Sequence, residues 1–185
     1  ANTALGYNAL LVNTTGSNNT ALGYATLGGS QNVGDANTAV GSNALTNFNP
    51  ASDDVGHNTG LGYESGASLT TGVENTYVGS GAGYRNQTGD NNTYVGYAAG
   101  KGNAGDNHSN NTAVGKSALT AVTDGALNTI IGSNAATAMT TGHENVILGY
   151  SAGDATQNTG YSVIIGSDAC GANMTNATDG TIAIG

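Results

Sequence analysis

The chain has 185 residues, a formal net charge of −9 and only three basic side chains. So few Lys and Arg residues leave little to bind a phosphate backbone or an anionic bilayer, so neither nucleic acid nor a membrane surface is expected as a partner. No apolar stretch approaches the length of a membrane span, which predicts no membrane insertion of this segment, and no signal peptide is recognisable.

One pentapeptide recurs eleven times, from residues 2–6 to residues 181–185, and each copy ends in a glycine preceded by Leu, Val or Ile. Successive glycines lie 17 to 21 residues apart. A unit this short cannot bury a core alone, so it must stack on its neighbours. We predict a single repeat array over residues 1–185. Because the chain begins inside one repeat and stops on the glycine of another, we expect a segment of a longer fibre protein.

Each pentapeptide is predicted to be a short strand. Its second residue is always β-branched, and the residue before the glycine is always aliphatic, so a period of two places both on one face. The residue between them faces the other way and is expected to lie against a partner chain, notably at Tyr77, Tyr94, Ile130, Ile147 and Ile164. The aliphatic column is predicted to be the structural core: Leu5, Leu22, Val40, Leu61, Val78, Val95, Val114, Ile131, Leu148, Ile165 and Ile184.

A second, weaker pattern follows each glycine, as in residues 7–10, and predicts a second strand in each coil. The chain contains no Asn-Gly pair, which argues against antiparallel hairpins and favours parallel stacking. Parallel coils would align the Asn that opens nine pentapeptides, from Asn2 to Asn145, in a column that bonds side chain to backbone. The sequence therefore predicts an all-β fold, a parallel β-solenoid (β-roll) of about ten coils of 17–21 residues.

The longest interval, from Gly41 to Gly62, is predicted to bulge out of the solenoid, because a coil can absorb extra residues only at a turn. It contains the only Phe and the only Pro of the chain. An exposed Phe beside a Pro would form a pre-ordered contact, although drift in a neutral spacer explains the same insertion. The possible contact loop comprises Phe48, Pro50, Asp53 and Asp54.

No residue pattern in the sequence indicates a catalytic or metal-binding site. His57, His108 and His143 share no repeat position and are interpreted as solvated turn residues, and Cys170 replaces the Leu of other repeats as a small buried residue. The pairs at residues 53–54 and 106–107 offer too few oxygen ligands for calcium. We expect no catalytic residue, no metal and no cofactor, and hence no enzyme.

A tyrosine follows the repeat glycine directly in five coils. These side chains either form an exposed ladder suited to stacking on sugars or proteins, or pack against neighbouring coils. They are Tyr7, Tyr24, Tyr63, Tyr97 and Tyr150.

The last three pentapeptides, residues 145–149, 162–166 and 181–185, resemble the head repeats of trimeric autotransporter adhesins. The longer form, Asn-Thr-Ala-Val-Gly followed by Tyr or Ser, Asn, Ala and Leu, is similar to repeats of phage tail fibres. The resemblance implies a homotrimer of parallel β-rolls around a three-fold axis. A coil of about 17 residues also encloses too little volume to bury two faces, which independently indicates an oligomer.

The resemblance implies a rigid extracellular rod that is part of a cell surface or of a virion appendage. Its expected partners are further copies of the same chain, in the homotrimer, and a cell-surface glycan or protein receptor. Two other functions stay open. An ice-binding solenoid would use the Thr column, but that column shares a face with the aliphatic side chains assigned to the core. A tailspike-like glycan hydrolase would need carboxylates paired across chains, and nothing in the sequence marks such a pair.

Overall fold

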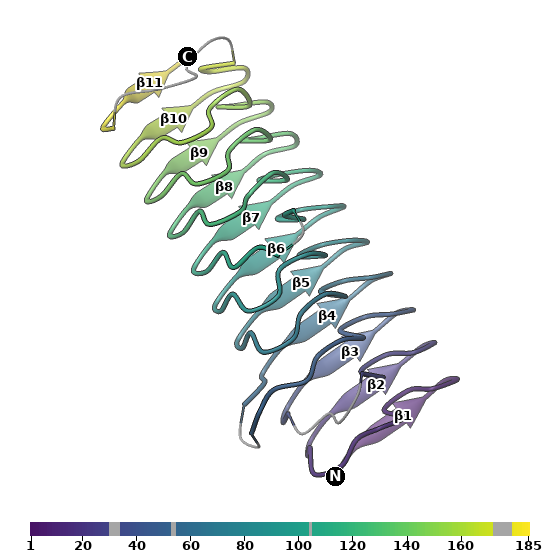
Figure 1. The fold of residues 1–185 in the computed structure, drawn as a ribbon. Coiled ribbons are helices and arrows are strands. Elements are labelled where there is room, and N and C mark those ends of the chain that lie inside the picture. Colours follow the sequence, from purple (N-terminus) through teal and green to yellow (C-terminus); the bar gives the residue numbers. More distant parts are fainter. Residues whose placement is uncertain (30–33, 53–54, 104, 172–178) are drawn as a thin grey trace.

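A computed structural model describes residues 1–29, 34–52, 55–103, 105–171 and 179–185. These residues form a rod of stacked coils with the two termini at opposite ends (Figure 1). The described part of the chain contains no helix. The predicted fold class is confirmed, since the chain is all-β and forms a parallel β-solenoid of about ten turns.

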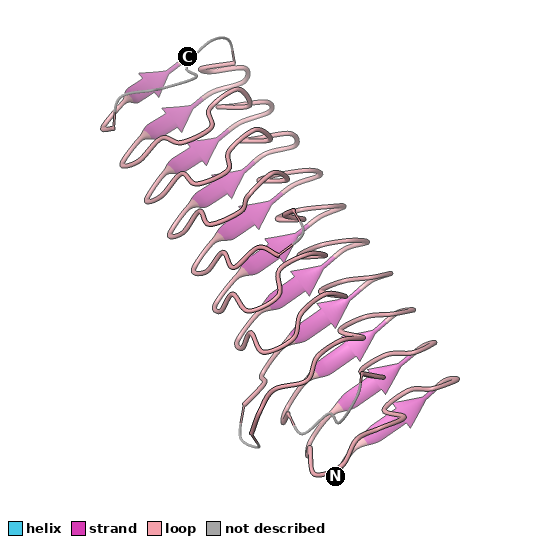
Figure 2. Ribbon diagram, in the orientation of Figure 1, coloured by secondary structure: helices cyan, strands magenta, loops and turns pink. Residues whose placement is uncertain are grey.

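Each pentapeptide contributes one three-residue strand, and all of the strands lie on one side of the rod (Figure 2). They pair in chain order as one parallel eleven-stranded sheet, and equivalent repeat positions face each other, as Tyr77 faces Tyr94. The strands are β1 (Thr3–Leu5), β2 (Thr20–Leu22), β3 (Thr38–Val40), β4 (Thr59–Leu61), β5 (Thr76–Val78), β6 (Thr93–Val95), β7 (Thr112–Val114), β8 (Thr129–Ile131), β9 (Val146–Leu148), β10 (Val163–Ile165) and β11 (Ile182–Ile184).

The second strand predicted after each glycine does not form. The second and fourth residues after the glycine have positive φ, for example 51° at Ala25 and 46° at Leu27, and a backbone that turns left-handed at every second residue cannot be extended. The segment still bonds from coil to coil, because the Ala25 amide donates to the Tyr7 carbonyl at 2.9 Å. Turns and strands therefore share one continuous backbone ladder.

The repeat glycine is required by the close approach of neighbouring coils. Gly96 has a φ of 136°, and a Cβ atom placed on it would lie 2.5 Å from the carbonyl oxygen of Gly115 in the next coil. No side chain fits in that space, and no L-residue adopts that conformation without strain. The glycine column therefore keeps the coils at strand spacing.

The column of asparagines is confirmed. Each Oδ1 accepts a hydrogen bond from the backbone amide of the equivalent residue in the next coil, as Asn75 does from Asn92 at 3.0 Å and as Asn145 does from Ser162. Each Nδ2 donates to a turn carbonyl, which in most coils belongs to a glycine, as Asn75 donates to Gly89 at 2.9 Å, whereas Asn92 donates to His108 at 2.8 Å. Asn75 and Asn92 are fully buried, so these bonds satisfy polar groups that water cannot reach.

The predicted direction of the strand faces was wrong. The middle residue of each strand points into the coil, and Tyr77, Tyr94, Ile130, Ile147 and Ile164 are 0% exposed within the single chain. They cannot lie against a partner chain. They pack with residues from the turns, including Leu27, Leu45, Leu69, Leu119 and Met139, and form the actual core.

The aliphatic residues predicted as the structural core lie instead on the outer side of the sheet. None of them is buried: Leu5, Leu22, Val40, Leu61, Val78, Val95, Val114, Ile131, Leu148, Ile165 and Ile184 are half-buried or exposed. The physical reason is that the coil returns behind the sheet, and its narrow interior admits only one side-chain column from the strand. Alternation separates the two faces of a strand but does not say which face the returning chain covers.

Candidate functional site

The outward side of the sheet carries two parallel columns of side chains, which we call the sheet face. One column consists of Thr, Val and Ile at the first strand position, and the other consists of the aliphatic residues at the third position. Leu61 is 45% exposed and Ile131 is 41% exposed, although both stand in the middle of the rod. In-register pairing repeats each column at the strand spacing of about 4.8 Å.

None of the strands in the described part of the chain contains a charged residue, so the sheet face is neutral in a chain of net charge −9. Ten intervals of about 4.8 Å make the face about 50 Å long, and the strand with its flanking residues makes it about 15 Å wide. The resulting area of about 750 Å², polar and apolar surface together, approaches the surface that one partner buries in a stable interface. The face therefore has the size and chemistry of an interface.

Three of the acidic residues near the turns are used by the fold. Asp35, Asp90 and Asp179 each accept a hydrogen bond from a backbone amide of the preceding coil, and the Asp90 bond to the Val73 amide is 2.8 Å long. Such a carboxylate satisfies a turn amide rather than acting on a substrate. Within the described ranges, no group of three His, Cys, Asp or Glu residues could hold a metal ion.

The aromatic side chain of the predicted contact loop is buried. Phe48 is 0% exposed and Pro50 is buried, so the prediction of a solvent-exposed Phe was wrong. Phe48 occupies the inward turn position that Leu69 and Met139 occupy in other coils, and a Cβ atom on Gly34 would lie 2.4 Å from its ring. The other two members of the loop, Asp53 and Asp54, lie outside the described residues.

His108 also differs from expectation, because it is completely buried. Its Nδ1 lies 2.8 Å from the hydroxyl of Tyr94, and its Nε2 has no hydrogen-bond partner among the described residues. Burial lowers the pKa of His108 to about 4, so the ring is neutral at physiological pH. His57 is exposed and His143 is half-buried, whereas Cys170 is half-buried against the core in the position of the other repeats' Leu.

The five tyrosines that follow the glycine stand in solvent, at the edge of the sheet face. Their exposed fractions run from 54% to 70%, so more than half of each side chain is open to solvent. The rings of Tyr7 and Tyr24, which occupy adjacent coils, stack with centroids 5.6 Å apart and planes inclined by 12°. Where tyrosines occupy successive coils they therefore form an exposed aromatic ladder.

Comparison with protein-family models, with curated proteins and with solved structures finds no match for this chain. In the described residues, no helix is long and apolar enough to cross a membrane.

Proposed function

We propose that this chain is a non-enzymatic module of an extracellular fibre, an adhesin or a phage tail fibre, that assembles as a homotrimeric rod for surface attachment. The observation that carries the proposal is the neutral, regular sheet face with its uncovered aliphatic column. Burial of this column would stabilise an assembly by about 25 cal/mol for each square ångström of apolar surface removed from water.

The chemistry of the sheet face favours a second copy of this chain as its partner. Chains of net charge −9 repel one another, so they associate best through a surface without charge. Columns that repeat in register along the whole rod can pack along a common axis without a change of spacing. A strip only three residues wide can also close around a three-fold axis and leave no apolar edge uncovered. The resemblance to trimeric adhesin heads supports three copies.

The mechanical role follows from the continuous bonding between coils. Backbone hydrogen bonds join strands and turns of adjacent coils, and the buried asparagines add a side-chain ladder along the axis. An array bonded in this way resists bending, which suits a spacer about 50 Å long that holds a contact site away from a cell or virion.

The decisive experiment is the mass of the folded protein in solution. Sedimentation equilibrium should give three times the 18.1 kDa of one chain. Ile131→Asp places a charge on the sheet face and should yield a folded monomer. The matched control is Leu127→Asp, which changes an exposed apolar residue to Asp at a turn position where other coils carry Glu74 and Glu144. A wild-type monomer at micromolar concentration would refute the proposed assembly.

A second candidate function, ice binding, gains support from the outward direction of the Thr column. Thr59, Thr76 and Thr112 are half-buried on the sheet face, and Thr93 is exposed there. A flat lattice of methyl and hydroxyl groups is suited to ordering water. Thermal hysteresis by a monomeric chain, abolished by Thr93→Tyr, would establish this function, whereas a trimer without hysteresis would exclude it.

A further inference from the structure

Several coils lack the tyrosine that follows the repeat glycine, and one of these coils lies between Tyr63 and Tyr97. The intervening coil carries Ser80 at the tyrosine position, and it carries Gly81 next to it. A Cβ atom on Gly81 would meet nothing within 4 Å, so open space lies above it. The gap belongs to a surface hollow of about 350 Å³ that spans the turns following β4, β5 and β6.

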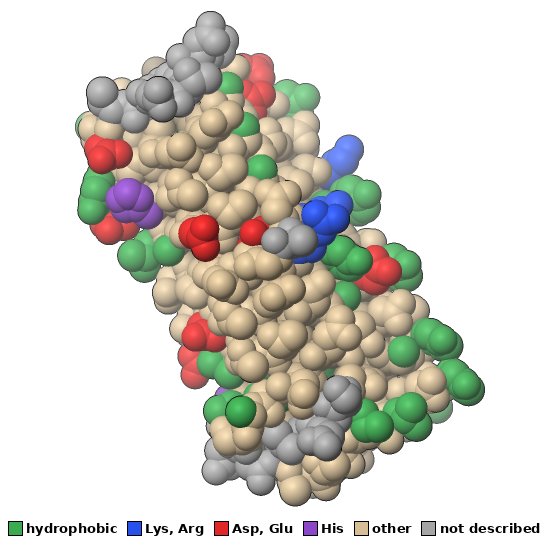
Figure 3. Space-filling view, in the orientation of Figure 1, with side chains coloured by type: hydrophobic (Ala, Val, Ile, Leu, Met, Phe, Trp, Pro, Cys, Tyr) green, Lys and Arg blue, Asp and Glu red, His purple; other side chains and the backbone are tan. Residues whose placement is uncertain are grey.

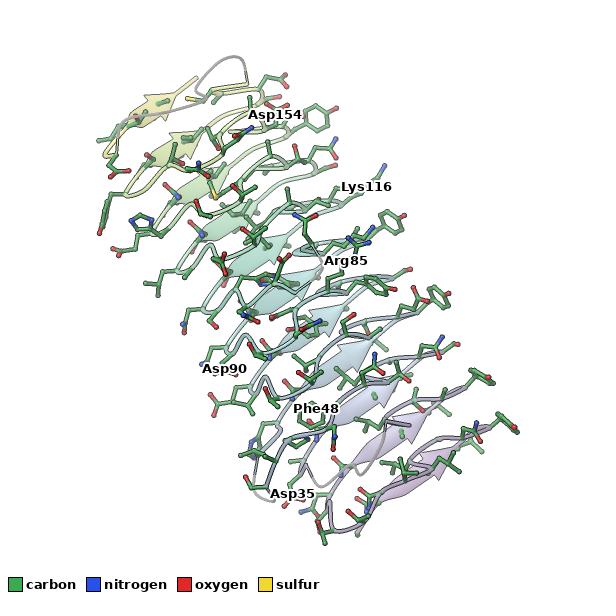
Figure 4. All side chains as sticks on the ribbon, viewed as in Figure 1. Asp35, Phe48, Arg85, Asp90, Lys116 and Asp154 are labelled. Carbon is green, nitrogen blue, oxygen red and sulfur yellow. The ribbon has the colours of Figure 1, made fainter. Side chains whose placement is uncertain are left out.

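Positive charge is concentrated at this hollow. Arg85 and Lys101, two of the three basic residues of the chain, line it. Figure 3 shows the Lys and Arg side chains gathered in one region about halfway along the rod, and Figure 4 shows Arg85 and Lys116 on the same edge. Glu64 is the one acidic residue of the lining, so the hollow has a formal charge of +1 in a chain of net charge −9.

The two cations are available to a ligand. Among the described residues, neither Arg85 nor Lys101 forms an ion pair with a carboxylate. The guanidinium of Arg85 lies 5.9 Å from the ring centre of Tyr84, and this contact holds it beside the hollow. Asp106 lies within electrostatic range of Arg85, but no ion pair joins the two side chains in the described structure.

We propose that this hollow binds one residue of an acidic glycan, with its carboxylated sugar ring between Tyr63 and Tyr97 and its carboxylate directed to Arg85 and Lys101. Tyrosines in adjacent coils stack at 5.6 Å, so two positions separated by one empty coil leave room for one ring of similar thickness. Aromatic faces pack against the apolar face of a pyranose ring, while Ser80 and Glu64 can bond its hydroxyl groups. Arg and Lys provide charge-assisted hydrogen bonds to the carboxylate.

A sugar fits these observations better than an acidic peptide does. A peptide usually gains its affinity from backbone hydrogen bonds to a free sheet edge or from a long groove, and this hollow provides neither. The inference rests on the proposed function, because an attachment fibre requires a contact site. The lining of the hollow comes from a single chain, so sugar binding can be measured independently of the oligomeric state.

Isothermal titration with a galacturonic acid trisaccharide, compared with the neutral galactose trisaccharide, tests the proposal. We expect the acidic sugar to bind at least about tenfold more tightly, and we expect Ser80→Tyr to reduce its affinity by at least about tenfold. Ser80→Tyr fills the gap with the residue that five other coils carry, so the fold is preserved. Arg85→Gln combined with Lys101→Gln should abolish the preference for the acidic sugar.

The matched control is Ser42→Tyr. Ser42 also lies between two tyrosines, Tyr24 and Tyr63, but its coil has Thr46 and Asn47 in place of Tyr84 and Arg85. This variant should bind as the wild type does. Equal binding of both sugars, unchanged affinity in Ser80→Tyr, or tighter binding of a tri-glutamate peptide would overturn the inference. A monomeric mass with intact sugar binding would refute the trimer alone.

Discussion

Asn75 gives the most direct test of the asparagine column. In Asn75→Ala the amide of Asn92 loses its acceptor, and at 0% exposure it cannot turn to water. The Gly89 carbonyl loses a 2.9 Å bond and retains only a 3.3 Å bond from Asn86. The Asn92 side-chain amide keeps its bond to the His108 carbonyl. That side-chain amide also loses its 3.0 Å bond to the Asn75 Oδ1, so the variant leaves one backbone donor and one side-chain N–H without an acceptor and weakens the bonding of one carbonyl.

An unsatisfied buried polar group costs about 1–3 kcal/mol, so we expect Asn75→Ala to lower the free energy of unfolding by about 2–4 kcal/mol. For a chain of this size the melting temperature should fall by about 5–15 °C. Thermal unfolding followed by circular dichroism, at one fixed protein concentration, measures the change. The matched control is Asn47→Ala, since Asn47 is exposed and its side chain makes no hydrogen bond in the described structure.

The aspartate variant separates hydrogen bonding from shape. Asn75→Asp keeps an acceptor for the Asn92 amide but turns a carboxylate oxygen toward the Asn58 Oδ1 and the Gly89 carbonyl, where Asn75 donates. Asn75→Asp should be less stable than Asn75→Ala at pH 7. Its stability should increase in acid, because the protonated carboxyl can donate a hydrogen bond to one of these two acceptors. If the free energies of unfolding of Asn75→Ala and Asn47→Ala differ by less than about 0.5 kcal/mol, the asparagine column does not stabilise the rod.

Three further predictions concern the core, the glycine column and the buried histidine. Leu69→Ala should lower the free energy of unfolding by about 2–5 kcal/mol, because Leu69 points into the core. Leu61→Ala, in a chain kept monomeric by Ile131→Asp, should lower it by less than about 1 kcal/mol. Equal losses in chemical denaturation would contradict the assignment of Leu69 as inward and Leu61 as outward. Gly96→Ala should prevent folding or destabilise by several kcal/mol, as judged by far-ultraviolet circular dichroism. Gly81→Ala should fold normally, because its Cβ meets no atom and other coils carry Ala25 and Ala98 at the same position with a similar positive φ. Because the pKa of His108 is lower in the folded chain, its neutral ring contributes its whole stabilising effect above pH 6.5. The free energy of unfolding should lose about 3 kcal/mol of this contribution as the pH drops to about 4, and no more below that. Asp106, whose pKa is raised, acts in the opposite sense, so the measurement is the difference between wild type and His108→Asn across this range; a constant difference would refute the assignment.

The positions of the strands and the parallel register could be predicted from the sequence. Three kinds of residue carried that information, namely the repeat glycine, the β-branched residue three places before it and the Asn that opens the pentapeptide. Each is local in origin. The glycine is needed where backbones of successive coils approach too closely for a Cβ atom, and the Asn is needed where a turn leaves an amide and a carbonyl to be satisfied.

The direction of the strand faces was the principal error, although a signal for it existed. Large residues in the middle of a strand accompany small ones six places later, as with Tyr77 and Gly83, whereas Ala39 accompanies Leu45. A Cβ atom on Gly83 would lie 2.4 Å from the Tyr77 ring, so the two positions share one interior volume. This exchange of volume within a coil identifies the inward column, and periodicity within a strand does not.

The sequence by itself determined the period, the strands and the order in which they pair, because each depends on residues within one coil or on its repetition. Only the tertiary structure decided that Phe48 and His108 are buried and that the Thr and aliphatic columns face outward. It also brought Tyr63, Arg85 and Lys101 together at one hollow from turns in three successive coils. The physical reason is that burial and proximity depend on where the chain returns behind the sheet, and the geometry of the left-handed turns sets that path rather than the pattern of the strands.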